Sequence, residues 1–139
     1  MNIDFKELAN KYQTPYYVYD FDHITNQYTQ LKESFRARKS LIAYAVKANS
    51  NLSVIKHLAN LGAGADCVSI GEVKRALKVG IPSYKIIFSG VGKSDEELKE
   101  ALTLDILLID GAASLDVIMV AAPVTFLINC KNISFSSLA

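Results

Sequence analysis

The feature that most constrains the fold is an apolar run that ends in a lysine, LIAYAVKANSN at residues 41–51. Its first six residues are all hydrophobic, which suits a strand buried on both faces of a parallel sheet. Because side chains alternate along a strand, Lys47 should share a face with Ala43 and Ala45, while Tyr44 packs against helices. A lysine at the C-terminal end of such a strand lies where α/β folds place their chemistry.

Lys47 allows two interpretations. A desolvated ε-amine has a lowered pKa and can attack a carbonyl carbon to form a Schiff base. Enzymes that depend on pyridoxal 5'-phosphate (PLP) hold their cofactor through this linkage. The other interpretation is a surface lysine whose alkyl stem crosses apolar neighbours, which is the commoner situation for a lysine considered alone.

Four stretches carry a resemblance to a known family. In chain order they are TPYYVYD (14–20), YAVKAN (44–49), GADCVSIGEV (64–73) and IIFSGVGKS (86–94). Together they resemble the PLP-dependent amino acid decarboxylases built on a TIM-type barrel, and most closely the diaminopimelate decarboxylases. Alanine racemase and the small single-domain PLP-binding barrel proteins share the strand-and-lysine arrangement but match the later stretches less well. The resemblance covers residues 5–110 and implies that Lys47 is the catalytic lysine that binds PLP covalently.

The resemblance also implies an activity. Diaminopimelate decarboxylases convert meso-2,6-diaminopimelate to L-lysine and CO2, the last step of lysine biosynthesis, and are cytoplasmic homodimers. Decarboxylases of carboxynorspermidine, arginine or ornithine stay as alternatives, because the family selects its substrate with residues from later segments. Two further alternatives are a non-catalytic truncated paralogue that pairs with a full-length enzyme, and a broken gene product without function.

Alternating strand and helix patterns predict a partial TIM-type (β/α) barrel with parallel strands and right-handed crossovers. Strands are expected to begin near Leu41, Gly64, Lys85 and Asp105, and a fifth is expected at 124–129. This gives four to five βα units. Helices are expected at 52–61 and from two serines with capping-box patterns, Ser69 with Glu72 and Ser94 with Glu97. Before the first unit we expect a short helix from Phe5 to Tyr12, a strand at 16–19, and a helix with Ile24, Tyr28, Leu31 and Phe35 in the core.

The length of 139 residues suffices for about half of a barrel, because a complete one needs roughly 250. We therefore expect one incomplete PLP-binding barrel domain over 1–139. It divides into a lead-in (1–40), four βα units (41–110) and a divergent tail (111–139). The family residues that stack on the PLP ring, bind its phosphate and contact its pyridine nitrogen have no counterpart here. The chain alone is therefore expected to bind PLP poorly, to turn over little, and to need a completing partner.

Asp66 is the second candidate for cofactor binding, because a carboxylate in an apolar strand needs a partner. By resemblance it points into the barrel mouth beside the cofactor; the alternative, equally weighted, is a strand-end aspartate that accepts bonds from backbone amides. The run from Ser89 to Ser94 ends like a phosphate-binding Walker motif, but Phe88 stands where its first glycine is required. We therefore expect a plain turn there, with Lys93 facing the mouth, and expect Asn49 to orient the loop after Lys47.

Composition and residue spacing argue against several classes of function and location. The net charge is +1, and no basic patch with aromatic residues indicates nucleic acid. The apolar stretch at 117–128 is interrupted by a proline and is shorter than the roughly 20 residues that span a membrane, and the N-terminus lacks the apolar region of a signal peptide. The cysteines and histidines show no metal-binding spacing, so we expect no metal, a reduced cytosolic protein, and both histidines on helix surfaces. These four residues are Cys67, Cys130, His23 and His57.

Overall fold

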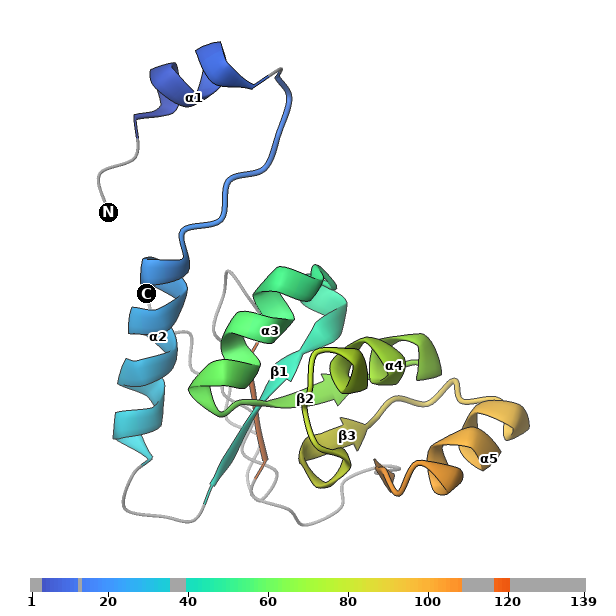
Figure 1. Ribbon diagram of the computed structural model, residues 1–139. Coiled ribbons are helices and arrows are strands. Elements are labelled where there is room, and N and C mark those ends of the chain that lie inside the picture. The colour runs from blue at the N-terminus through green and yellow to red at the C-terminus, as the bar shows by residue number, and fades with distance from the viewer. Residues whose placement is uncertain (1–3, 13, 36–39, 109–116, 121–139) are drawn as a thin grey trace.

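The computed structural model describes residues 4–12, 14–35, 40–108 and 117–120 (Figure 1). Its helices are α1 (Phe5–Lys11), α2 (Phe21–Ser34), α3 (Leu52–Leu61), α4 (Ile70–Lys78) and α5 (Asp95–Thr103), with two short 3-10 helices, η1 (Val46–Ala48) and η2 (Ser83–Lys85). The strands are β1 (Leu41–Ala45), β2 (Gly64–Cys67), β3 (Ile86–Phe88), β4 (Leu107–Leu108) and β5 (Val117–Val120).

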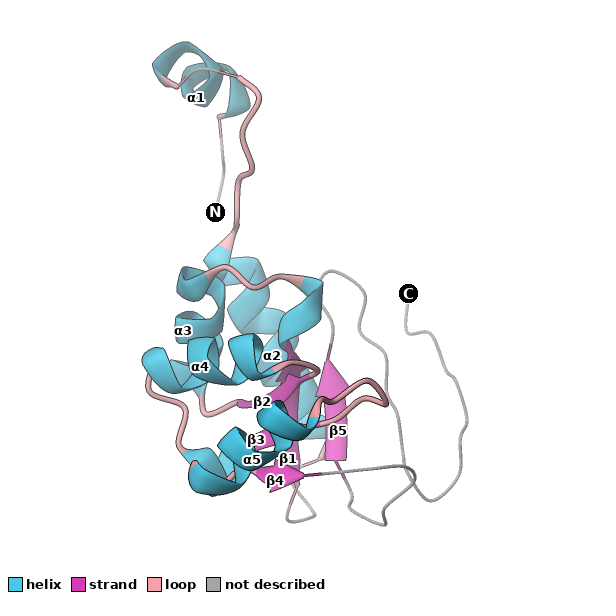
Figure 2. Cartoon of the chain, turned by 90° about the vertical axis from the view of Figure 1, so that its right-hand side faces the viewer, coloured by secondary structure: helices cyan, strands magenta, loops and turns pink. Residues whose placement is uncertain are grey.

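These strands form one parallel sheet in the order β4-β3-β2-β1-β5. Strands β1 to β4 lie side by side in chain order, each joined to the next through a helix, which is the pattern of a βα barrel wall. Figure 2 shows α3, α4 and α5 on one side of the strands. The predicted α/β class, with parallel strands and part of a barrel, is confirmed.

Local sequence signals explain where the helices begin. The Asn51 side chain caps α3 by accepting from the Ser53 amide, and Ser69 caps α4 by accepting from the Glu72 amide. Helix α5 has the complete capping box, in which Ser94 and Glu97 each accept from the other's backbone amide. In α4 the box is incomplete, because the Glu72 carboxylate accepts from the amide of Val68 instead of Ser69.

The core lies between the sheet and its helices. From the strands, Tyr44, Cys67 and Phe88 point into this core, where they meet buried residues of α3 and α4 such as Ile55 and Val73. The next residues along the strands lie on the opposite face, because strand side chains alternate. There Ala45 of β1, Asp66 of β2 and Ile87 of β3 form one row across the sheet.

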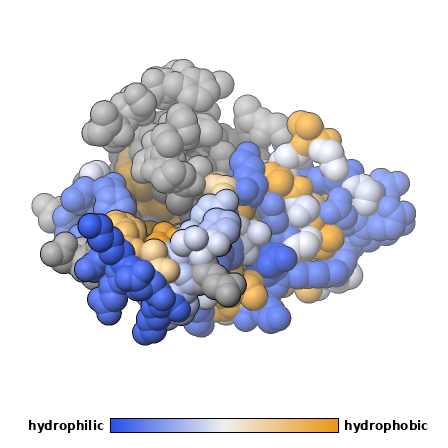
Figure 3. Space-filling model, turned by 90° about the horizontal axis from the view of Figure 1, so that it is seen from above, coloured by the Kyte–Doolittle hydropathy of each residue, from blue (hydrophilic) through white to orange (hydrophobic). Residues whose placement is uncertain are grey.

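Helix α2 packs beside α3, and its apolar side chains lie in or against the core as predicted. Tyr28 and Leu31 are buried, while Ile24 and Phe35 pack against the same core. Asp20 caps this helix by accepting from the amides of its first turn. Among the described residues no helix has the length and apolar character needed to cross a membrane. Figure 3 shows mainly hydrophilic side chains over the part of the molecule that contains α4 and α5.

The N-terminal segment differs from the prediction. Residues 16–19 are extended but belong to no strand, because none of the strands that the structure describes pairs with them, and Tyr17 is 89% exposed. Helix α1 buries none of its residues, so the predicted apolar positions Phe5 and Tyr12 face solvent. Figure 1 shows α1 at the far end of this extended arm, away from the sheet.

The C-terminal part differs as well. Strand β4 begins at Leu107, later than the predicted start near Asp105, because Asp105 has a positive φ of 54° and forms a turn before it. Leu102 of α5 is 66% exposed. No strand was expected at 117–120, yet β5 forms there and pairs with β1. The predicted strand at 124–129 lies outside the described residues.

Candidate functional site

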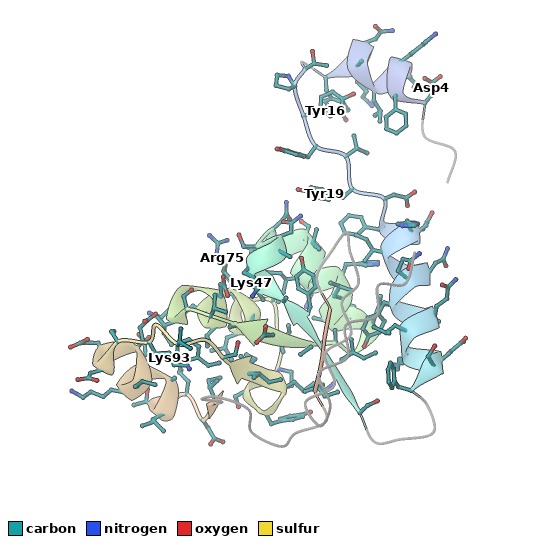
Figure 4. The ribbon with its side chains drawn as sticks, turned by 180° about the vertical axis from the view of Figure 1, so that it is seen from behind. Asp4, Tyr16, Tyr19, Lys47, Arg75 and Lys93 are labelled. Carbon is teal, nitrogen blue, oxygen red and sulfur yellow. The ribbon has the colours of Figure 1, made fainter. Side chains whose placement is uncertain are left out.

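Lys47 lies just beyond the end of the strand that was predicted to contain it. Strand β1 ends at Ala45, and Val46 to Ala48 form η1. The strict alternation expected for Lys47 therefore does not hold, since a 3-10 turn rotates its side chain away from the strand pattern. Its place at the C-terminal end of the strand is as expected, and Figure 4 shows Lys47 at that end of the sheet, near Arg75 of α4. The side chain is exposed.

Asp66 lies at the same end of the neighbouring strand and is only 2% exposed. Its Oδ1 accepts a hydrogen bond of 2.6 Å from the hydroxyl of Ser89. Ser89 directly follows β3, and its amide donates to the Cys67 carbonyl oxygen at 2.8 Å, which continues the pairing of β3 with β2. The partner found for Asp66 is thus a serine hydroxyl, whereas the structural alternative expected backbone amides.

The electrostatics connect these groups to Lys47. Burial raises the pKa of Asp66, while the Ser89 hydrogen bond and the positive charge of Lys47 act to lower it. Lys47 is therefore close enough to favour the ionised carboxylate. The structure brings Lys47, Asp66 and Ser89 together at the C-terminal ends of three adjacent strands.

Ser89 was missed by the sequence analysis, although a signal existed. Phe88 points into the core, so the next residue should return to the face of Asp66. Strand β3 pairs with β2 through Asp66 and Ile87, which places Ser89 one step beyond this pair. Only the pairing register, which the sequence pattern left undetermined, places Ser89 beside Asp66.

Because the pKa of Asp66 is raised in the folded protein, the free energy of unfolding should depend on pH. A carboxyl group whose pKa is higher in the folded than in the unfolded state stabilises the fold at pH below its ordinary value, and this contribution is lost as the pH rises through the folded-state pKa. Asp66→Asn removes this dependence but keeps an acceptor for Ser89. We expect its stability relative to wild type to be higher near pH 7 than near pH 4, measured by urea unfolding. Asp105→Asn controls for the loss of one charge, and a relative stability that falls with rising pH would contradict the prediction.

The turn that carries Lys47 is held from several sides. The Asn49 side chain accepts from the Asn51 amide at 3.0 Å, which confirms that Asn49 orients this loop. The Tyr44 hydroxyl donates to the Asn49 carbonyl oxygen at 3.0 Å, and Arg75 of α4 reaches the Ser50 carbonyl oxygen at 3.4 Å. Sequence reasoning did not identify these contacts of Tyr44 and Arg75.

The segment 89–94 forms the expected turn between β3 and α5. Gly90 has a positive φ of 93°, which a glycine adopts without strain. Lys93 donates to the Gly90 carbonyl oxygen, and its amine lies 5.4 Å from the centre of the Phe88 ring. Glu97 also accepts from the Ile70 amide at 3.0 Å, so it links the starts of α4 and α5.

A cavity of about 750 Å³ lies on the helix side of β1. Its walls come from residues 17–20 of the extended arm, from α2 and α3, and from the turn that carries Lys47. This volume is in the range of small-molecule sites, but Asp66 and Ser89 do not line it. We place the candidate site at Lys47, Asp66 and Ser89, because these residues carry the chemistry.

His57 is not a simple helix-surface residue as predicted. Its Nε2 lies 2.7 Å from the Thr25 hydroxyl, and its ring lies 4.8 Å from that of Phe21. Because Thr25 and Phe21 belong to α2 and His57 to α3, this contact joins the two helices. The His57 side chain thus has a structural role in the packing of α2 against α3.

Comparison with known proteins places the chain in a family. Residues 21–128 match the family described as "Pyridoxal-dependent decarboxylase, pyridoxal binding domain". The chain belongs to this family. Its cofactor is therefore PLP, as the sequence resemblance implied.

Relatives within the family share high identity with this chain. A diaminopimelate decarboxylase from Campylobacter jejuni is 62% identical over 108 residues, which are 78% of this chain and 27% of the relative. One from Helicobacter pylori is 60% identical over 107 residues, or 77% of this chain and 26% of the relative. The chain thus spans about a quarter of the length of these curated relatives.

Solved structures agree with the fold. The crystal structure of diaminopimelate decarboxylase from Helicobacter pylori complexed with L-lysine matches with a TM-score of 0.72 and 57% identity. The match covers 76% of this chain and 27% of that one. It supports assignment of β1 to β4 and their helices to part of a family barrel.

The residues present fit PLP in their chemistry. A primary amine is required for covalent attachment, and Lys47 supplies an exposed one at the C-terminal end of the sheet. The buried carboxylate of Asp66 lies close enough for the Lys47 charge to affect its pKa. The small side chains of Ala43 and Ala45 precede Lys47 along β1. The assignment of Lys47 and Asp66 to the cofactor stays a prediction.

Proposed function

We propose that this chain forms the cofactor-lysine side of a diaminopimelate decarboxylase, with Lys47 as the residue that binds PLP covalently and Asp66 as the carboxylate beside it. The observation that carries the proposal is the placement of Lys47 and the buried carboxylate of Asp66 at the C-terminal ends of two adjacent parallel strands, where the positive charge of Lys47 acts to lower the pKa of Asp66. Ligands of α/β proteins bind at this end of the strands.

Each residue has a defined part in this proposal. PLP, when bound, stores the electrons released as the substrate loses CO2. The ε-amine of Lys47 is the nucleophile that attaches the cofactor. Asp66 attracts and orients the ammonium form of Lys47, and the hydroxyl of Ser89 orients Asp66 through the 2.6 Å hydrogen bond.

The proposed substrate is meso-2,6-diaminopimelate, which would yield L-lysine and CO2. The 62% identity with a diaminopimelate decarboxylase supports this choice over the carboxynorspermidine, arginine and ornithine alternatives. We also propose that 1–139 is one incomplete barrel domain. The groups that bind the PLP phosphate and its pyridine nitrogen would then come from a completing polypeptide, and assembly would follow the homodimer of the family in a cytoplasmic enzyme.

Borohydride trapping tests the proposal directly. The purified chain is incubated with PLP, reduced, digested and analysed by mass spectrometry. We expect the PLP adduct on the peptide that contains Lys47, in clear excess over peptides that contain the exposed Lys74 and Lys78. Labelling spread evenly over the surface lysines would overturn the assignment.

Turnover is measured separately, as CO2 released from meso-2,6-diaminopimelate. We expect release by the purified chain of residues 1–139 to stay near background, because the proposal assigns the phosphate-binding and pyridine-binding groups to a completing polypeptide. Substantial release would show that the completing polypeptide is not required.

A further inference from the structure

The turn that carries Lys47 is tied back to the strand before it. Tyr44 lies on β1, is 2% exposed, and points into the core on the helix side of the sheet. Its hydroxyl reaches past the end of the strand and donates to the Asn49 carbonyl oxygen at 3.0 Å. This bond joins a rigid strand residue to a position two residues after Lys47, so η1 lies within the closed segment.

The other end of the turn is anchored on α3. The Asn49 side chain accepts from the Asn51 amide at 3.0 Å, and the Asn51 side chain accepts from the Ser53 amide at 2.8 Å as the cap of α3. Asn49 is therefore bound through its backbone to β1 and through its side chain to the start of α3. The contact from Arg75 to the Ser50 carbonyl oxygen is longer, at 3.4 Å, and exposed.

We propose that Tyr44 is a positioning residue for Lys47: its hydroxyl holds the turn at 46–49 and thereby fixes where the ε-amine lies at the C-terminal end of β1. The inference deepens the proposed function and rests on it. An exposed lysine side chain has many rotamers, so the backbone of the turn decides which region its amine samples. Loss of the Tyr44 bond leaves a part-buried carbonyl without this donor and frees the turn to move.

The Tyr44 hydroxyl is suited to this task over a wide pH range. Burial, together with the nearby Tyr19, raises the pKa of Tyr44 to about 12, so the hydroxyl keeps its proton at neutral and mildly alkaline pH. Figure 4 shows Tyr19 on the extended arm, above the end of the sheet where Lys47 lies. Tyr44 thus donates throughout the range in which trapping with PLP is carried out.

The test compares Tyr44→Phe with Tyr28→Phe. Both variants remove one hydroxyl from a buried tyrosine of the same core, but Tyr28 is on α2 and Tyr44 is on β1. The first measurement is hydrogen–deuterium exchange without PLP. We expect Tyr44→Phe to speed exchange in the peptide covering 46–51 by about two- to tenfold, the range that one hydrogen bond supports, with unchanged exchange in β2.

The second measurement is borohydride trapping at limiting PLP. We expect labelling of Lys47 to fall by about two- to tenfold in Tyr44→Phe and to stay at the wild-type level in Tyr28→Phe. Incorporation of p-aminophenylalanine at position 44, which restores a donor, should recover the labelling. A purely structural role would instead raise exchange throughout the sheet and lower the unfolding midpoint without selective loss at Lys47.

The two hypotheses fail in different ways. If wild type is not labelled at Lys47, the proposed function fails, while the exchange measurement still decides whether Tyr44 holds the turn. If wild type is labelled and Tyr44→Phe shows wild-type exchange and labelling, the positioning role is overturned and the proposed function stands.

Discussion

Lys47→Ala is expected to abolish specific attachment of PLP to this chain while leaving the fold intact. The substitution removes the amine that the proposal requires for covalent attachment. Lys47 is exposed, so the free energy of unfolding should change by no more than about 0.5 kcal/mol. The measurement is borohydride trapping followed by peptide mass spectrometry, together with urea unfolding followed by circular dichroism.

Lys93→Ala is the matched control, because Lys93 is another lysine at the C-terminal ends of the strands, in the turn after β3. We expect Lys93→Ala to keep the adduct on Lys47 and to lose only its own background labelling. Trapping of PLP by Lys47→Ala at the wild-type level would show that the cofactor attaches elsewhere. In that case Lys47 would be only an inherited family signature.

Phe88→Ala is expected to have the largest effect on stability. Phe88 is on β3, is fully buried, and packs in the core between the sheet and the helices. Truncation of a buried phenylalanine to alanine typically costs about 3–5 kcal/mol, because transfer free energy is lost and a cavity remains. Since small domains have about 5–15 kcal/mol in total, this variant should be largely or wholly destabilised.

Leu102→Ala is the control for Phe88→Ala. Leu102 is also a large apolar residue but is 66% exposed on α5, so its loss should change the stability by no more than about 0.5 kcal/mol. Urea unfolding of both variants measures the difference. Equal effects of the two substitutions would mean that the helix side of β3 is not the core of the chain.

Features set by neighbouring residues were predictable. The apolar run of β1 and the capping box of Ser94 with Glu97 were predicted from short patterns and are found in the structure. Such patterns work because a helix cap or a buried strand depends mainly on residues a few positions apart. The family resemblance likewise rested on short contiguous stretches and is confirmed.

Features that depend on pairing between distant segments were not predictable. Residues 16–19 have the composition of a strand, but none of the described strands pairs with them, and they stay extended, with residues 17–19 exposed. Residues 117–120 were not predicted as a strand, yet they form β5 against the free edge of β1. Strand propensity describes a fit to a sheet, and the presence of a neighbouring edge decides whether a strand forms.

The α/β class, the family, and the position of Lys47 at the end of its strand could be predicted, because these follow from local composition and contiguous motifs. The tertiary structure alone decided that Ser89 meets Asp66, that Tyr44 binds the turn of Lys47, and that β5 pairs with β1. The Ser89 and β5 contacts depend on the register and order of strands, and the Tyr44 contact on how the 3-10 turn folds back. No pattern within a single segment specifies that register, order or turn geometry.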